Sequence, residues 1–222
     1  MRPLVHPTEG VELEHARSLA RERLFGYEGS VRYVPRLVAA GSAPTDAFVE
    51  PLIENPPPSP LREHEHIPQV AWMVERDGVF VHVPASEREE RDVMRGHALV
   101  TMLDGELSNE ALEDLPGVNI ATNGAYAAEL LLDPDHLAEL HRILGGKVYL
   151  AGAPRRGRFL VGGVGAGVDG MRAFVARVRR EHDEAPLSQR ISPVTLLVRD
   201  GAPTAVVGEL QLAALAQATG GH

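Results

Sequence analysis

The fold is decided by residues 147–183, which read KVYLAGAPRRGRFLVGGVGAGVDGMRAFVARVRREHD. Two short apolar runs, 148–150 and 159–161, flank a polar turn that contains Gly157. β-Prone runs on either side of a glycine-containing turn predict a β-hairpin. A glycine-rich loop, from Gly162 to Gly170, then leads away from the hairpin.

The same stretch ends in the clearest helical pattern of the chain. The residues at i, i+3, i+4 and i+7 are apolar and share one face of a helix: Met171, Phe174, Val175 and Val178. The pattern predicts that this face is buried. The arginines that fall outside the stripe are expected to be exposed, and they are Arg172, Arg177, Arg179 and Arg180.

Two further hairpins are predicted on either side of this central unit. Residues 70–83 and 194–207 each hold two β-prone runs around an Asp-Gly pair, which favours a tight turn. A type I′ turn of this kind requires a positive φ at Gly201. Residues 31–39 are also β-prone, but Pro35 either confines them to the edge of a sheet or breaks the strand.

Helices are predicted where a capping residue or a proline precedes a periodic run. Thr8, Ser86 and Ser108 are the expected caps. The predicted helices cover residues 9–25, 87–97, 109–115, 119–132, 135–144 and 210–218. A strand is expected at 97–103.

The prolines of residues 41–68 predict an extended connection rather than a long helix or a central strand. We interpret residues 1–222 as a single domain with a Pro-rich connecting loop at 41–68. Because hairpins alternate with helices, and no run of βαβ units dominates, the sequence predicts an α+β fold. Its sheet is expected to be mainly antiparallel, built from hairpins, with helices packed on it.

Composition excludes several classes of function. The chain has a formal net charge of −9, which disfavours nucleic acid and anionic membranes as partners. It contains no cysteine, so disulfides, thiolate nucleophiles and Cys-ligated metals are excluded. We expect a soluble cytoplasmic protein, because no signal-like segment and no run of roughly 20 apolar residues is present. The oligomeric state stays open.

One candidate ligand site is the loop from Gly162 to Gly170. Gly165, Gly167 and Gly170 match the spacing G-x-G-x-x-G between a predicted strand and a predicted helix. Against a nucleotide site, Asp169 places a negative charge where a phosphate would lie, and too little chain follows for a doubly wound sheet. The favoured interpretation is a structural loop, with a small-ligand or nucleotide sensor as an alternative.

A second candidate is the run Glu63-His64-Glu65-His66. His64 and His66 would lie on the same side of an extended chain, as two metal ligands do. The sequence nominates no third ligand, so a solvated loop is favoured and a metal-dependent hydrolase is an alternative. We predict no metal, no cofactor and no catalytic residue, because no serine lies in G-x-S-x-G and no pair of acids stands out.

Arginines form the one local contrast with the negative net charge. Arg155, Arg156 and Arg158 occupy the turn of the central hairpin, and Arg177 and Arg180 lie on the helix that follows. Such a cluster grips acidic groups, although charge runs are more often solvated faces. We predict these five arginines as partner-binding residues.

The second half also resembles a known family. The motifs are LSNEALEDL, GVNI, GAYAAELLL, LAGAPRRGRFLVGG and PLSQRIS, followed by a strand that ends in Arg-Asp-Gly. Over roughly residues 99–201 this order resembles the uncharacterised YtpQ-like family of bacterial proteins. The resemblance implies a cytoplasmic α+β protein without an assigned reaction, and it transfers no functional residue. The leading hypothesis is therefore a non-enzymatic protein that binds another protein.

Overall fold

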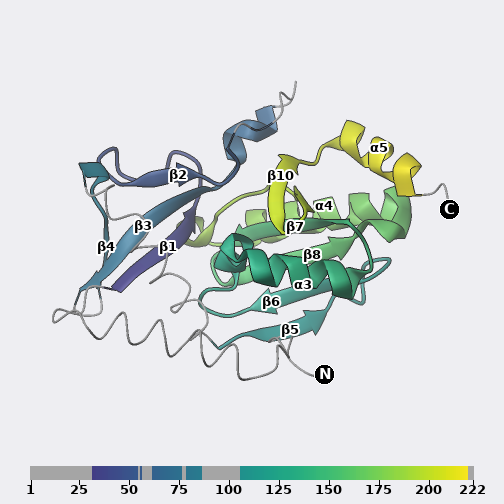
Figure 1. Ribbon diagram of the computed structural model, residues 1–222, viewed down its shortest axis with the longest axis horizontal. Helices are drawn as coiled ribbons and strands as arrows, with labels where there is room; N and C mark the ends of the chain where they lie inside the picture. The colour runs from purple at the N-terminus through teal and green to yellow at the C-terminus, as the bar shows by residue number, and fades with distance from the viewer. Residues whose placement is uncertain (1–31, 55, 57–61, 77–78, 87–105, 220–222) are drawn as a thin grey trace.

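The computed structural model describes residues 32–54, 56, 62–76, 79–86 and 106–219 (Figure 1). The predicted helices at 9–25 and 87–97 and the predicted strand at 97–103 lie outside these residues. Within them the chain forms two antiparallel sheets with helices packed against them, which confirms the α+β class.

The smaller sheet is organised around β3 (Gln69–Arg76). β1 (Arg32–Val38) pairs with one side of β3 over its whole length. The other side is shared by β2 (Val49–Pro51), which pairs with the start of β3, and β4 (Val79–His82), which pairs with its end. β1 carries Pro35 and pairs with β3 alone among the described strands, so the predicted edge strand is confirmed.

The larger sheet has the strand order β10-β9-β7-β8-β6-β5, and every described pair in it is antiparallel. Its strands are β5 (Ser108–Ala111), β6 (Asn119–Asn123), β7 (Val148–Arg155), β8 (Arg158–Gly163), β9 (Leu196–Arg199) and β10 (Ala202–Val206). The predicted hairpins are β7–β8, β3–β4 and β9–β10. In the last, Asp200 and Gly201 have φ of 50° and 75°, as a type I′ turn requires.

Helices cover both faces of the larger sheet, as Figure 1 shows. One face holds the 3-10 helix η3 (Ala128–Leu132) and α3 (Pro134–Leu144). The other holds α4 (Gly167–Glu184) and α5 (Glu209–Thr219). Three more 3-10 helices are described: η1 (Arg62–His66), η4 (Val164–Ala166) and η5 (Leu187–Gln189). None of the helices in the described part of the chain is long and apolar enough to cross a membrane.

The core has two layers because side chains alternate along β7. Tyr149 and Ala151 join the cluster that contains α3, η3 and the inner face of the smaller sheet. Leu150 joins the cluster under α4 and α5. The predicted stripe of α4 is buried there, with Phe174 1% exposed and Val178 fully buried. One apolar cluster therefore contains residues from both sheets.

Two predicted helices were wrong. Residues 109–115 contain the end of β5 and a turn, and residues 119–132 contain β6 and then η3. Pairing explains the change, since β6 lies between β8 and β5 and its backbone is bonded on both sides. By contrast α3 is confirmed: the Asp133 side chain accepts from the Asp135 and His136 amides, and Gly145 ends the helix at φ 72°.

The Pro-rich segment is also more ordered than predicted. Residues 41–68 hold β2 and η1 among their described parts. The Phe48 amide donates to the Val83 carbonyl at 2.6 Å and the Trp72 amide donates to the Phe48 carbonyl at 3.1 Å. These bonds lie where β2 gives way to β4 along β3, so the segment is built into the smaller sheet.

Candidate binding surface at the β7–β8 turn

The turn between β7 and β8 brings three chain segments together. Gly157 turns the chain at φ 69°, and a Cβ at this position would lie 3.1 Å from the Gly124 carbonyl oxygen. The Arg156 amide donates to the Gln189 carbonyl at 2.8 Å, and Arg155 forms an isolated bridge with Arg190. The segment that follows α4 therefore lies beside the turn, with residue 124 on its other side.

The arginines of this region have no carboxylate partner among the described residues. The Nη1 of Arg155 donates to the Arg156 carbonyl at 3.4 Å. Arg190 donates from Nε to the Ala185 carbonyl at 2.9 Å, and from Nη2 to the Asp183 carbonyl, at the C-terminal end of α4. The half-buried guanidinium of Arg156 makes no hydrogen bond within the part of the chain that the structure describes. The positive charge of these three groups stays uncompensated by direct pairing.

An exposed apolar side chain belongs to the segment that adjoins the turn. Leu187 begins η5 and is 81% exposed, against 55% for Val118 and 47% for Val81. Because Gln189 of the same 3-10 helix accepts the Arg156 amide, Leu187 belongs to this neighbourhood. We call Arg155, Arg156, Leu187 and Arg190 the turn-arginine surface.

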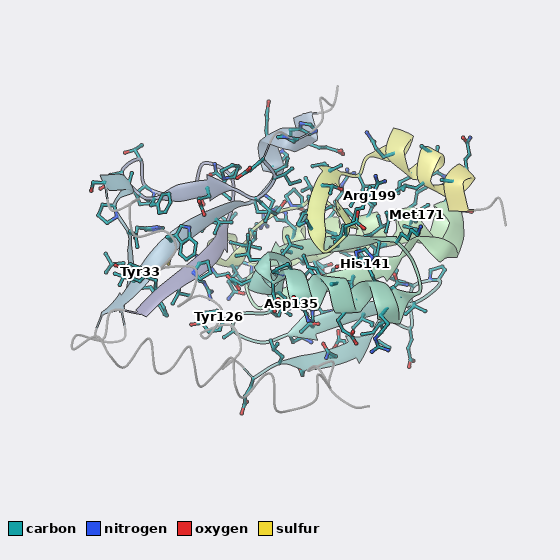
Figure 2. The ribbon with its side chains drawn as sticks, in the orientation of Figure 1. Tyr33, Tyr126, Asp135, His141, Met171 and Arg199 are labelled. Atoms are coloured by element: carbon teal, nitrogen blue, oxygen red, sulfur yellow. The ribbon has the colours of Figure 1, made fainter. Side chains whose placement is uncertain are left out.

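A buried acid lies beneath the turn-arginine surface. Glu129 of η3 is fully buried, and its Oε1 lies 3.3 Å from both the Arg36 Nε and the Leu37 amide nitrogen. Arg36 also donates from Nη1 to the Ala125 carbonyl and lies 5.0 Å from the centre of the Tyr126 ring. Tyr126 marks this junction between β1 and the larger sheet in Figure 2.

The pKa values reflect this crowding. Burial lowers the pKa of the Arg156 guanidinium, the charge of Arg36 lowers it further, and Glu129 partly offsets both. Burial raises the pKa of Glu129 above its ordinary value, although Arg36 and Arg156 both act against the rise. The two arginines and the acid thus influence one another across three separate elements. The Oε2 of Glu129 has no hydrogen-bond partner among the described residues.

The other predicted arginines lie in a different environment. Arg158 is 7% exposed and binds both oxygens of Glu181, at 2.9 and 3.1 Å. It also contacts the Glu110 carboxylate at 2.7 Å and the Asn123 side-chain oxygen at 2.6 Å. Arg177, which is 17% exposed, donates to Glu181 at 2.7 Å and to Asp114 at 2.6 Å. This network ties β5, β6 and β8 to α4.

The remaining arginines of α4 are exposed, and each has an acidic neighbour. Arg172 lies 3.5 Å from Asp169, Arg179 lies 2.7 Å from Glu63 of η1, and Arg180 lies 3.8 Å from Asp114. They line a shallow groove of about 510 Å³ along α4, together with Val175, Ala176, Asp183 and Glu184. We call the set of Arg158, Arg172, Arg177, Arg179 and Arg180 the paired arginines.

The five predicted site residues are therefore divided by the structure. Arg155 and Arg156 come together at the turn, whereas Arg158, Arg177 and Arg180 belong to the paired arginines. Arg177 is less exposed than the helical stripe predicted, because Glu181 and Asp114 hold it against the protein. Sequence reasoning missed Arg36, Glu129, Leu187 and Arg190. Leu187, an apolar residue in a short polar segment after a helix, was the one signal available.

The candidate metal ligands do not lie on an extended chain. His64 and His66 belong to the 3-10 helix η1, where residues two apart point to different sides. The His66 carbonyl accepts from the Ser192 hydroxyl at 2.6 Å, so η1 is attached to the segment between α4 and β9. The residues that the structure describes contain no group of three or more His, Cys, Asp or Glu placed to hold a metal ion.

The glycine-rich loop is closely packed at two of its positions. A Cβ at Gly162 would lie 2.5 Å from the Asn119 side-chain oxygen, and one at Gly170 would lie 2.4 Å from the Ala166 Cβ. Gly167 has φ 71° where α4 begins. Packing requires glycine at Gly162 and Gly170, and backbone conformation favours it at Gly167. Such requirements are typical of a structural loop.

The chain was compared with family models, curated proteins and solved structures, and none of them matches it. The resemblance to the YtpQ-like family therefore stays a prediction.

Proposed function

We propose that the protein is a non-enzymatic binding protein, and that its turn-arginine surface binds an acidic segment of another protein. One observation carries the proposal: the main chains of Arg155, Arg156 and Arg190 adjoin at the turn, and none of the three side chains has a carboxylate partner among the described residues, in a chain of net charge −9. The paired arginines, by contrast, each have an acidic neighbour.

Physical chemistry supports a ligand of opposite charge. The charge of Arg36 acts against that of Arg156, and burial of Arg156 increases this repulsion because it weakens solvent screening. A carboxylate-bearing partner relieves the repulsion and forms charge-assisted hydrogen bonds with the planar donor groups. Arginine is also among the residues that contribute most at protein interfaces.

The partner class is argued from Leu187 and from the net charge. A protein partner buries the Leu187 side chain, which is 81% exposed, as an apolar anchor beside the polar contacts. A long polyanion such as nucleic acid is repelled by the chain as a whole at distances beyond the patch. A protein segment with a few acidic residues is attracted by the turn-arginine surface, and it is repelled less than a polyanion by the net negative charge of the chain.

The test is a charge reversal with a matched control. Arg155→Glu and Arg156→Glu are combined, and the control combines Arg172→Glu and Arg180→Glu on α4, which changes the net charge equally. Binding of a fluorescent Asp-rich peptide, and capture of proteins from the native host, are measured at low and at high salt. We expect the turn variant to lose binding and the control to retain it, with a weaker interaction at high salt.

Leu187→Ser provides an independent arm. It removes the apolar anchor and leaves every charge in place, so we expect weaker capture of protein partners with an unchanged salt dependence. The proposal fails if the turn variant retains every partner of the wild type. It also fails if the wild type binds single-stranded RNA or duplex DNA more tightly than the acidic peptide.

A further inference from the structure

Glu129 is the one fully buried carboxylate among the described residues, and its charge acts on Arg156 of the proposed binding surface. We propose that its protonation controls the surface: when Glu129 takes up a proton, its negative charge no longer offsets the charges of Arg36 and Arg156, and the surface attracts the partner's carboxylates more strongly. This inference rests on the proposed function and adds its regulation.

Glu129 is paired with one of the charges that it would control and influences the other. The charged groups that face it are Arg36 from β1 and Arg156 from the β7–β8 turn. The phenol of Tyr126, from the loop before η3, covers Arg36 rather than Glu129. Glu129 holds Arg36 at 3.3 Å through Oε1, whereas its Oε2 is buried without a described hydrogen-bond partner. A proton on Oε2 therefore removes the negative charge and leaves the Leu37 amide bond to Oε1 in place.

The two protonation states present different surfaces. With Glu129 ionised, its negative charge offsets one of the two nearby positive charges. The positive potential that the two guanidinium groups produce in solvent is then smaller. With Glu129 protonated, it no longer offsets the charges of Arg36 and Arg156, and this part of the molecule carries a larger net positive charge. Burial raises the pKa of Glu129, which favours proton uptake at a higher pH than for an exposed glutamate.

Linkage makes the effect reciprocal. A partner carboxylate near Arg156 replaces the negative charge that Glu129 supplies, and it also repels the ionised form of Glu129. Binding of an acidic segment therefore takes up a proton from solvent onto Glu129. Affinity for the partner should rise as pH falls through the raised pKa of this group, while the partner's own carboxylates remain ionised.

The experiment compares the wild type with Glu129→Gln, which has nearly the same shape and lacks the charge. Binding of the Asp-rich peptide is measured between about pH 5 and about pH 8, a range in which aspartate stays ionised. Wild-type affinity is expected to rise toward the acid end, by about three- to tenfold, as one nearby charge is removed. Glu129→Gln should bind tightly at every pH in the range. Glu139→Gln, which removes an acid from the α3 pair with Arg142, is the control and should behave as wild type.

A second measurement needs no variant. Calorimetric titration of wild-type protein with the peptide, in buffers of different ionisation enthalpy, reports the protons taken up on binding. We expect uptake near the pH where the affinity changes. If the peptide binds through Arg156 but without proton uptake, and with the same pH dependence in wild type and Glu129→Gln, the regulation is wrong and the proposed function stands. If charge reversal at Arg155 and Arg156 changes nothing, the proposed function has failed as well.

Discussion

The paired arginines and the arginines of the turn-arginine surface differ in what neutralises them. Arg158 and Arg177 share Glu181, and both are largely removed from solvent. Arg155 and Arg190 donate to main-chain carbonyls instead, which satisfies their hydrogen bonds and leaves their charge. Arg156 and Arg158 are two residues apart in sequence, yet they fall into opposite groups.

This difference separates a structural role from a binding role. An arginine whose donors are taken up by buried carboxylates holds elements together, because removing either partner leaves a charge in a poorly solvated place. An arginine that retains its charge at the surface contributes little to folding and remains available to a ligand. Exposure and partner type distinguish the two roles where composition does not.

The largest expected effect concerns Arg158. Arg158→Ala leaves Glu181 with Arg177 alone and removes the Arg158 bond to Asn123, and we expect it to lower the free energy of unfolding by about 3 kcal/mol. Urea denaturation followed by circular dichroism measures the change. If the loss stays below about 1 kcal/mol, the network is not the buried structural group that we describe.

The second prediction compares how the stability contributed by two carboxylates, Glu181 and Glu129, depends on pH. Burial would raise the pKa of Glu181, but hydrogen bonds from Arg158 and Arg177 outweigh it and lower the pKa below its ordinary 4.5. Stability from Glu181 is therefore present above that value and is lost as pH falls through the lowered pKa. Glu129 has the opposite sign: its raised pKa means that its contribution is complete below 4.5 and is lost as pH rises through the raised value.

Denaturation midpoints across this pH range test both signs. Glu181→Gln should remove the stabilisation on the alkaline side of 4.5, whereas Glu129→Gln should be no less stable than wild type at neutral pH. A Glu129→Gln variant that is much less stable at neutral pH would show that the ionised pair with Arg36 outweighs the burial of the acid.

A smaller effect is expected at the exposed end of the network. Arg177 and Asp114 approach to 2.6 Å, but Asp114 is 55% exposed, so solvent screens the pair. A double-mutant cycle with Arg177→Ala and Asp114→Ala should give a coupling of about 0.2–1 kcal/mol. A coupling as large as that expected for Arg158 would mean that exposure does not separate the members of the network.

The smallest effect on stability is expected at the turn. Arg155→Ala and Arg156→Ala should each change the free energy of unfolding by no more than about 0.5 kcal/mol, because neither side chain has a carboxylate partner in the described residues. Relief of repulsion should make the Arg156 change neutral or slightly stabilising. Marked destabilisation by either change would place these residues with the paired arginines and remove the basis of the binding surface.

Much of the fold was predictable because its signals are local. The Asp200-Gly201 pair and the apolar stripe from Met171 to Val178 each specify their element without help from the rest of the chain. The strands within residues 109–115 and 119–132 were missed because the capping residues and leucines of these segments follow a pattern typical of helices. β6 is a strand because it pairs with β8, and β5 because it pairs with β6, and no local pattern records either contact.

The candidate site was only half predictable for the same reason. Arg155 and Arg156 were found as neighbours in sequence. Arg36 and Glu129 come from different sheets and meet only in the folded chain. A shift of register in β7 between Gly152 and Arg155 decides how the turn is presented, and the letters RRGR do not reveal it. A buried glutamate inside the run AELLL carries no signal of its own.

The polar bonds between the two sheets have a consequence for the order of folding. They join Leu37 to Glu129, Arg179 to Glu63, and Ser192 to His66, across 92, 116 and 126 residues. Long chain closures are entropically unfavourable and slow, whereas hairpins close over a few residues. We therefore expect the hairpins of each sheet to form early and the smaller sheet to dock onto the larger one late.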